Sequence, residues 1–385
     1  MVHIVGAGPA SIVAALNLVK NGYKPIIHEQ NSNVGMRFNG DFQGIENWST
    51  REDALSFLSS IGVKVNFKCE PYTYYEFYGP SRKKVLLKTS RPLFYLVERG
   101  SDEQSIDYGL MCQAIDAGVE FVWNDKLETV PEGTVIVGTG PKSADAIAKG
   151  IVFSTSHPNI AVGMFDNTIS PKAYAYLLVS QGKATFATCL FEDFKNEREY
   201  FEKAIERLHS IMSIDINSPK EFGGFVNFFL KGSATKSGRI LYVGKNAGFQ
   251  DALWGFGMRY AMLSGYLAAR SITDGLDYNS LCDKHIRPMM RASLANRLLF
   301  SALGNRGYDW VLNRFANSED IIPILRKFYN PSRFTGILFK IASMKYHTRL
   351  IDKECMHRNC NCVWCRHGKY AHKDLDSVPA LNREG

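Results

Sequence analysis

The sequence predicts a mixed α/β protein (α+β in part), in which a parallel-sheet domain is interrupted by an inserted β-sheet domain and followed by a C-terminal helical, cysteine-rich appendage. Three observations lead to this fold class. Short apolar runs enter glycine turns that open helical patterns, alternating runs with turn residues between them occupy the middle of the chain, and basic residues and cysteines gather after residue 283. With 385 residues, 45% of them hydrophobic, the chain can bury more than one core.

The first element is an apolar run at residues 2–5, which enters the turn Gly6-Ala7-Gly8 and then a helical pattern, while a second run at 25–28 ends at Glu29. Strand, glycine turn, helix and a following acidic residue form the dinucleotide-binding fingerprint. Gly6 allows the tight turn, Gly8 lets the backbone approach a pyrophosphate, and Glu29 accepts hydrogen bonds from ribose hydroxyls. A carboxylate disfavours a 2′-phosphate, so we expect FAD or NAD rather than NADP. The expected contacts are Gly6, Gly8, Pro9, Ala10, Ser11 (in place of the third glycine), Glu29, Gln30 and Arg37.

The middle of the chain alternates helices with hairpins. Ser49 and Glu52 have capping-box spacing before a helix through residues 55–61. The aromatic residues of the first hairpin favour cross-strand packing, with the wall of an apolar substrate cavity as the alternative. The remaining expectations are hairpins at 72–78 with 85–87 and at 174–179 with 184–190, strands at 133–140 and 222–230, and helices at 104–117 and 194–212.

The segment 240–261 is the most informative part of the sequence. An apolar run enters Gly244, a loop carries Gly255 and Gly257, and a helix rich in small residues follows. Glycines at the ends of strands and helices indicate close approach of the backbone to a flat or anionic group. The segment resembles the flavin-contacting signature of the FAD proteins that include aromatic-ring hydroxylases and, more closely, geranylgeranyl reductases. The resemblance covers residues 1–275, with its motifs in the family's chain order.

This resemblance implies a Rossmann-type FAD-binding domain with a β-sheet substrate domain inserted into it. Residues 171–178 are similar to the reductases' substrate-cavity motif, which makes Tyr174 and Tyr176 the candidate catalytic residues, as cavity walls or proton donors. Thr139 and Lys245 stand where the family has aspartates. The implied FAD contacts are Arg99, Gly138, Gly140, Gly244, Lys245, Asn246, Gly255, Phe256, Gly257 and Met258.

The last quarter of the chain carries the charge imbalance. The chain has 46 Lys+Arg and 38 Asp+Glu, of which residues 284–373 hold 17 and 5. Apolar residues at helical spacing predict helices that expose a cationic face, either as a solvated surface or for anionic lipid headgroups or a phosphorylated substrate. Cys355, Cys360, Cys362 and Cys365 have the spacing of a zinc site or an iron–sulfur cluster, with unligated redox thiols as the third interpretation. The four scattered cysteines are expected to be reduced.

These observations divide the chain into five parts. The expected parts are a discontinuous FAD-binding domain (1–70, 91–160 and 235–280), a β-rich substrate domain (71–90 and 161–234), a basic helical region (281–350), a Cys/His metal-binding segment (351–373) and a disordered tail (374–385).

The expected function is that of an FAD-dependent oxidoreductase of the geranylgeranyl reductase type, which reduces C=C bonds of a prenyl lipid or a similar apolar substrate. The alternatives are an FAD-dependent monooxygenase and a degenerate flavin fold that serves as a metal-stapled interaction protein. No second fingerprint is present, so NAD(P)H bound transiently or a redox protein is expected to donate electrons. We expect a cytoplasmic protein, without a signal peptide, with peripheral contact to a membrane surface and no nucleic acid partner.

Overall fold

The computed structural model describes residues 2–127, 129–141, 144–228 and 232–346. Its first sheet has the strand order β15-β16-β9-β1-β2-β8, in which every pair is parallel except β15 with β16. The apolar runs expected at residues 2–5, 25–28 and 133–140 are all strands of this sheet. The strands are β1 (Val2–Val5), β2 (Pro25–Glu29), β8 (Glu120–Trp123), β9 (Thr134–Val137), β15 (Thr235–Lys236) and β16 (Ile240–Tyr242).

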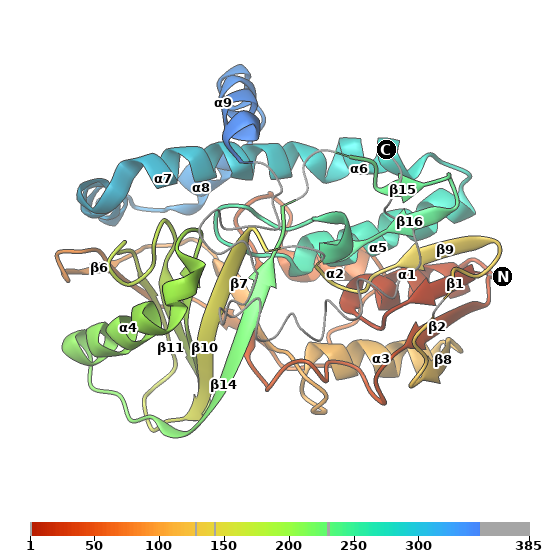
Figure 1. Ribbon diagram of the computed structural model, residues 1–385, viewed down its shortest axis with the longest axis horizontal. Coiled ribbons are helices and arrows are strands. Elements are labelled where there is room, and N and C mark those ends of the chain that lie inside the picture. The colour runs from red at the N-terminus through yellow and green to blue at the C-terminus, as the bar shows by residue number, and fades with distance from the viewer. Residues whose placement is uncertain (1, 128, 142–143, 229–231, 347–385) are drawn as a thin grey trace.

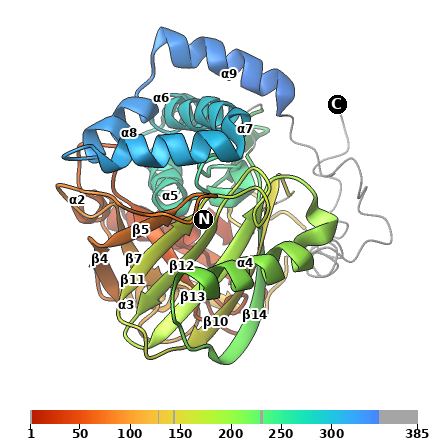
Figure 2. The same ribbon diagram turned by 90° about the vertical axis from the view of Figure 1, so that its left-hand side faces the viewer.

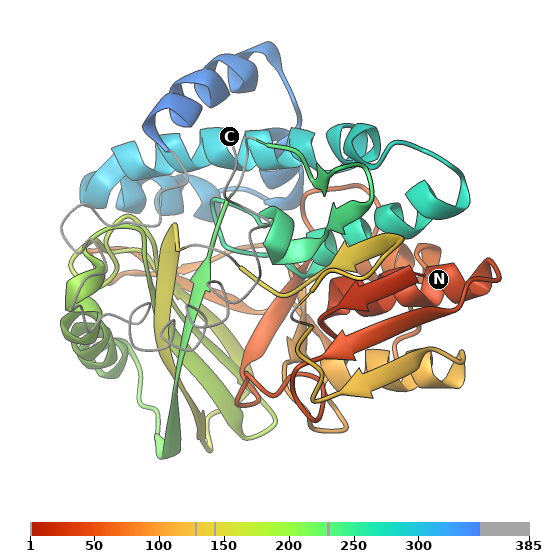
Figure 3. The same ribbon diagram turned by 45° about the vertical axis from the view of Figure 1, so that its right-hand side comes forward.

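Helices α1 (Pro9–Lys20), α3 (Ile106–Asp116) and α5 (Met258–Thr273) accompany this sheet (Figures 1 and 3). Helices α1 and α5 pack unusually closely, because a Cβ at Gly265 of α5 would lie only 1.9 Å from the carbonyl oxygen of Ala10. The small residues expected in the helix after residue 257 therefore allow two backbones to touch. This contact sets the first turn of α1 against the middle of α5.

The second sheet has the order β14-β10-β13-β12-β11-β5-β6 and is mostly antiparallel. Both predicted hairpins belong to it, and the charged helix α4 (Glu197–Ile211) packs Phe201, Ala204 and Leu208 against its core. By its pairing with β13 and β14, β10 is part of this sheet, although the sequence grouped residues 91–160 with the first domain. The strands are β5 (Tyr75–Tyr78), β6 (Lys84–Leu86), β10 (Ala146–Ser154), β11 (Ile160–Met164), β12 (Ala175–Ser180), β13 (Lys183–Leu190) and β14 (Asn217–Val226).

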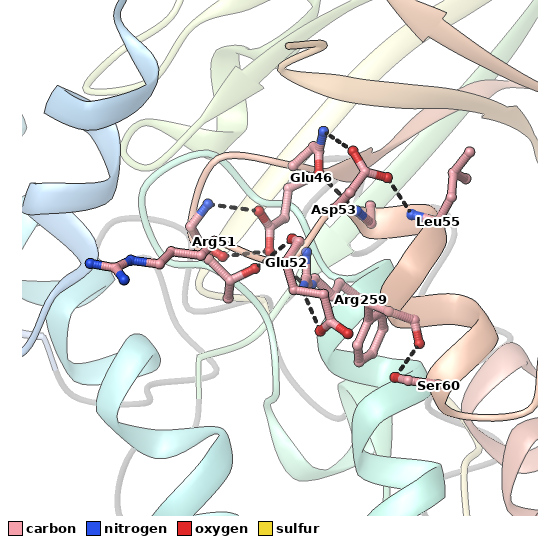
Figure 4. Close-up of polar contacts among 12 residues, drawn as sticks. Glu46, Arg51, Glu52, Asp53, Leu55, Ser60 and Arg259 are labelled. Atoms are coloured by element: carbon pink, nitrogen blue, oxygen red, sulfur yellow. Dashed lines mark hydrogen bonds and ion pairs between the residues drawn. The ribbon is translucent and has the colours of Figure 1, made fainter. Parts of the chain in front are cut away.

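A small sheet of β3 (Phe42–Glu46), β7 (Phe94–Glu98) and β4 (Cys69–Tyr72) pairs beside helix α2 (Ala54–Ser60). The capping box expected at Ser49 and Glu52 is wrong, because the carboxylate of Asp53 accepts the hydrogen bond from the Leu55 amide (Figure 4). The Ser49 hydroxyl instead donates to Glu46, 2.7 Å away. Helix α2 begins at Ala54, so Asp53 directly precedes it, whereas Ser49 is too far from the first helical amides to cap them.

The C-terminal helices form a layer over one end of both sheets (Figures 1 and 2). They are α6 (Tyr278–His285), α7 (Arg287–Ala316), α8 (Ile322–Tyr329) and α9 (Arg333–Lys345). Helix α7 is interrupted by a kink at Gly304, where a φ of 61° and a ψ of −172°, which only glycine adopts readily, separate two helical segments. In the described part of the chain, no helix combines the length and apolar character needed to cross a membrane.

Candidate functional site

A continuous cavity of about 1760 Å³ lies between the two large sheets and the C-terminal helices. Ser11 is the one expected contact outside its wall: it is fully buried, and a Cβ at Gly138 would lie 2.2 Å from its hydroxyl. The residues expected from the sequence that line the cavity are Gly6, Gly8, Pro9, Ala10, Glu29, Gln30, Arg37, Arg99, Gly138, Gly140, Tyr174, Tyr176, Gly244, Lys245, Asn246, Gly255, Phe256, Gly257 and Met258.

One end of the cavity is built by the first glycine turn. Gly6 has a φ of +88°, and a Cβ there would lie 2.9 Å from the carbonyl oxygen of Gly138, so only glycine fits. Helix α1 begins at Gly8 without a side-chain cap or an acidic residue in its first turn. The Glu29 carboxylate is held at the end of β2 by the Ala7 amide at 2.8 Å and the Asn31 side-chain amide at 2.7 Å. An uncapped helix start beside a fixed carboxylate can hold a phosphate and a ribose.

Three cations face the cavity next to this turn. Arg99 donates to both carboxylate oxygens of buried Asp107, at 2.8 and 2.9 Å. Burial opposes the charge of Arg99, but Asp107 outweighs it and raises the pKa of the guanidinium. Arg37 is exposed and lines the cavity. Burial lowers the pKa of Lys245 to about 7, with further contributions from Arg37 and Arg99. This excess of positive charge favours an anionic ligand.

The glycine loop before α5 is fastened by residues that the sequence analysis did not single out. The carboxylate of Asp251 accepts from the Leu253 amide at 2.9 Å and from the Tyr329 hydroxyl at 2.6 Å. Burial raises the pKa of Asp251 to about 6. Arg297 of α7 donates to the carbonyl oxygens of Ala252, Leu253 and Lys172. Because these hydrogen bonds all go to backbone carbonyl oxygens, Arg297 fixes the backbone of the loop.

Beneath the start of α5, Arg259 lies between two carboxylates of the β3–α2 region (Figure 4). Its guanidinium is 3.8 Å from Glu46 and 3.6 Å from Glu52, and it stacks over Phe57 at 4.5 Å. Trp48 meets Phe256 of the glycine loop edge to face, with ring centroids 4.7 Å apart. Trp48 also meets Tyr329 of α8, with ring centroids 6.4 Å apart, so the segment after β3 and helix α8 support the glycine loop together.

The other end of the cavity is aromatic. Phe77 and Phe165 stack with centroids 5.8 Å apart, and Phe165 also contacts Trp254 and Phe300 at 5.5 and 5.7 Å. All four line the cavity, so the aromatic residues of the first hairpin both pack together and face its interior. This end suits an apolar ligand.

The two candidate catalytic tyrosines, Tyr174 and Tyr176, lie at this aromatic end of the cavity, with their ring centroids 6.1 Å apart. The Tyr174 hydroxyl donates to the carbonyl oxygen of Trp254 and so holds the glycine loop. The Tyr176 hydroxyl has no hydrogen-bond partner among the described residues. Burial raises the pKa of both phenols well above the ordinary value, so both stay protonated at neutral pH. Of the two hydroxyls, only that of Tyr176 is not donated to an acceptor among the described residues.

No family model matches the chain, and no curated protein matches it in sequence. Solved structures do match its fold. A geranylgeranyl bacteriochlorophyll reductase-like protein from Thermoplasma acidophilum is 16% identical, with 91% of this chain and 97% of that one covered and a TM-score of 0.67. The chain has a flavoprotein fold. The p-nitrophenol 4-monooxygenase PnpA from Pseudomonas putida (13% identical, 88% and 97% covered, TM-score 0.58) and the flavin-dependent brominase Bmp2 (13%, 85% and 97%, 0.57) share it.

The expected metal site at Cys355, Cys360, Cys362 and Cys365 lies outside the described residues. Within those residues, no three His, Cys, Asp or Glu side chains gather closely enough to hold a metal ion. The scattered cysteines are unpaired, as expected, with Cys282 buried and Cys69, Cys112 and Cys189 half-buried.

Proposed function

We propose that this chain is an FAD-dependent oxidoreductase that reduces C=C bonds of a prenyl lipid or a similar apolar substrate. The observation that carries the proposal is the continuity of one cavity, which joins the glycine turn and three cations at one end to an aromatic chamber at the other. A dinucleotide with an attached flat ring system would span these two ends, with its charge among the cations and its ring system near the glycine loop. An apolar chain would fill the remainder.

The residues present fit FAD. In the described structure, the side-chain oxygens of Asn246 and Gln250 are buried without a hydrogen-bond partner, and both residues line the cavity. A buried acceptor without a donor is costly, so each favours a ligand that brings N–H or O–H groups, as the ribityl chain and ring of FAD do. Gly255, with a φ of +74°, leaves room for a flat ring against the backbone.

When bound and reduced, FAD supplies a hydride for an alkene carbon. The protein's own residues position the alkene, exclude water and provide a proton. Phe77, Phe165 and Trp254 form apolar walls against which a hydrocarbon chain packs. The Tyr176 hydroxyl, which is protonated and has no hydrogen-bond partner in the described structure, would donate the proton to the second alkene carbon, and the phenolate left behind would take a proton back from water after the product leaves. Tyr174 holds the loop through Trp254.

A second candidate is an FAD-dependent monooxygenase, because PnpA shares the fold over 88% of this chain. Stopped-flow measurement under anaerobic conditions separates the two. Protein reduced with dithionite should be reoxidised by a geranylgeranyl lipid, with the saturated lipid detected by mass spectrometry. If the lipid does not reoxidise the reduced protein, but oxygen added in a second experiment does and a hydroxylated product forms, the monooxygenase is correct. If FAD does not bind at all, both enzymatic proposals fail.

The metal assignment of the C-terminal cysteines remains a proposal from the sequence, with zinc and an iron–sulfur cluster as the two options. Metal analysis of the purified chain distinguishes them. Zinc leaves the flavin absorption unchanged, whereas an iron–sulfur cluster adds a broad visible absorption that dithionite bleaches. Protein without either metal would leave the thiols unligated.

A further inference from the structure

Helix α9 exposes an apolar face to its surroundings. Phe334, Ile337, Ile341 and Met344 have 63, 61, 45 and 66% of their surface exposed. Steps of three, four and three residues keep these side chains on one face of a helix. Figure 2 shows α9 as the outermost helix, lying across α7 on the side away from the sheets. We refer to these four residues as the α9 face.

The opposite side of α9 packs against α7. Ala342 is fully buried, and Phe339 and Tyr346 pack with it against Leu294 and Leu298 of α7. The four side chains of the α9 face therefore take no part in the packing of α9 against α7. Large apolar side chains gathered on an exposed surface mark an interaction site.

Charge around the α9 face is uniformly positive. Residues 322–346 contain five Lys and Arg and no Asp or Glu. Arg333, Lys340 and Lys345 are exposed on α9, and none of them pairs with a carboxylate in the described part of the chain. On a helical projection they flank the apolar face on both sides. Basic residues that border an apolar helical face are typical of helices that lie in the interface of an anionic membrane.

The cavity opens at this same surface. Phe334 belongs both to the α9 face and to the cavity wall. Trp310 of α7 and Phe328 of α8 also line the cavity and are 66 and 44% exposed. Apolar side chains at a cavity mouth are costly to leave in water but are favourable in contact with lipid.

We propose that the α9 face docks on an anionic lipid bilayer, so that the mouth of the cavity meets the membrane and a lipid substrate enters without crossing water. The membrane contact itself does not depend on the proposed function, and only the purpose of substrate entry rests on it. A second copy of the chain is the poorer occupant. A two-fold dimer through this face would bring the cations of both copies together with no carboxylate on α9 to pair them.

Flotation with vesicles tests the docking. The full chain should bind vesicles of phosphatidylcholine with added phosphatidylglycerol, bind pure phosphatidylcholine weakly, and be released by high salt. Failure to bind the anionic vesicles while FAD binding and alkene reduction persist would overturn the docking and leave the proposed function standing. Vesicle binding without any FAD binding would overturn the proposed function and leave the docking standing.

Matched variants locate the contact. Ile337→Ser with Ile341→Ser should weaken binding about tenfold, because two apolar anchors are lost. Ile115→Ser with Leu276→Ser is the control and should leave binding unchanged, because Ile115 on α3 and Leu276 in the loop between α5 and α6 are 51 and 42% exposed away from α9. Arg333→Gln with Lys340→Gln should flatten the dependence on salt. Each variant is first checked for wild-type melting. Equal losses in the control and α9 variants would contradict the proposal.

Oxidation of Met344 by peroxide identifies any other occupant. In monomer without vesicles it should oxidise at the rate of a methionine in a peptide, and anionic vesicles should protect it. Protection without vesicles in a monomer would mean that the chain covers its own α9 face. Protection that appears with protein concentration, together with a doubled mass, would mean a second copy. Either result overturns membrane docking.

Discussion

The Tyr329 hydroxyl of α8 donates a 2.6 Å hydrogen bond to the carboxylate of Asp251 in the glycine loop, 78 positions earlier in the chain. The same carboxylate accepts from the amides of Leu253 and Trp254. The hydrogen bond ties the helical layer to the loop that is proposed to hold the flavin ring. The C-terminal helices therefore support the site as well as cover it.

Removing this bond should loosen the loop. Tyr329→Phe is expected to lower the free energy of unfolding by about 2 kcal/mol, because a buried hydrogen bond to a charged group is lost. FAD should also dissociate faster. Tyr23→Phe is the control, since its hydroxyl makes only a long 3.4 Å bond on an exposed side chain. Urea unfolding checks the stability, and equal effects of the two substitutions would contradict a special role for Tyr329.

The pKa of Asp251 predicts a pH dependence of stability. Burial raises it to about 6, whereas in the unfolded chain it is about 4. The folded state therefore binds the proton more tightly, and the contribution of Asp251 to the free energy of unfolding falls as the pH rises from about 4 to about 6. Asp251→Asn should remove this fall. The test is the difference between wild-type and variant stability across that range, and a constant difference would refute the assignment.

The contact between α1 and α5 should tolerate no side chain at Gly265. Alanine there would place its Cβ 1.9 Å from the Ala10 carbonyl oxygen, so we expect a loss of about 3 kcal/mol or more as the helices move apart. Gly336 of α9 has open space around its Cβ position. Gly336→Ala should be neutral or stabilising by up to about 1 kcal/mol through helix propensity. Thermal melting of both variants is the measurement, and similar melting temperatures would disprove the close packing.

Lys245 should couple FAD binding to pH. Its pKa of about 7 in the cavity means that the side chain loses its charge as the pH rises above 7. An anionic cofactor favours the charged form, so binding takes up a proton and the affinity should fall by up to about tenfold per pH unit above 7. Lys245→Met should bind FAD more weakly at low pH and show a flat profile. Fluorescence titration of apoprotein measures this, with exposed Lys64→Met as the control. A flat wild-type profile would place the lysine away from the phosphates.

Tyr176→Phe should slow alkene reduction about a hundredfold while FAD content and the rate of flavin reduction stay unchanged, because only the proton donor is lost. Tyr174→Phe should instead weaken FAD retention, since its hydroxyl holds Trp254. Anaerobic single-turnover kinetics distinguishes the two effects. If Tyr176→Phe reduces the alkene at the wild-type rate, the proton comes from elsewhere.

Local features of the site were predictable from the sequence. The turn at Gly6 and Gly8, the carboxylate at Glu29 and the glycine loop at Gly255 each depend on residues within one strand, turn and helix. Backbone geometry forces glycine where φ is positive or another chain comes close. Such positions can therefore be recognised without knowing the rest of the fold.

The supports of the site were not predictable in this way. Arg297 reaches the Ala252 carbonyl across 45 positions, and a single arginine in a basic helix gives no sign of such a contact. Asp53 rather than Ser49 caps α2, because the helix begins only at Ala54, and Ser49 instead donates to Glu46 of β3. The grouping of β10 with the second sheet likewise follows from pairing with distant β14. Long-range contacts decided the position of Arg297 and the placement of β10.

The most direct test of the central claim is the flavin content of the purified 385-residue chain. The protein, expressed and supplied with FAD, should carry about one FAD per chain after gel filtration. Absorbance would show the flavin, and chromatography of the released cofactor would identify it as FAD rather than FMN. A chain that retains no flavin and gives no titration signal with FAD at neutral pH would contradict the assignment of the cavity.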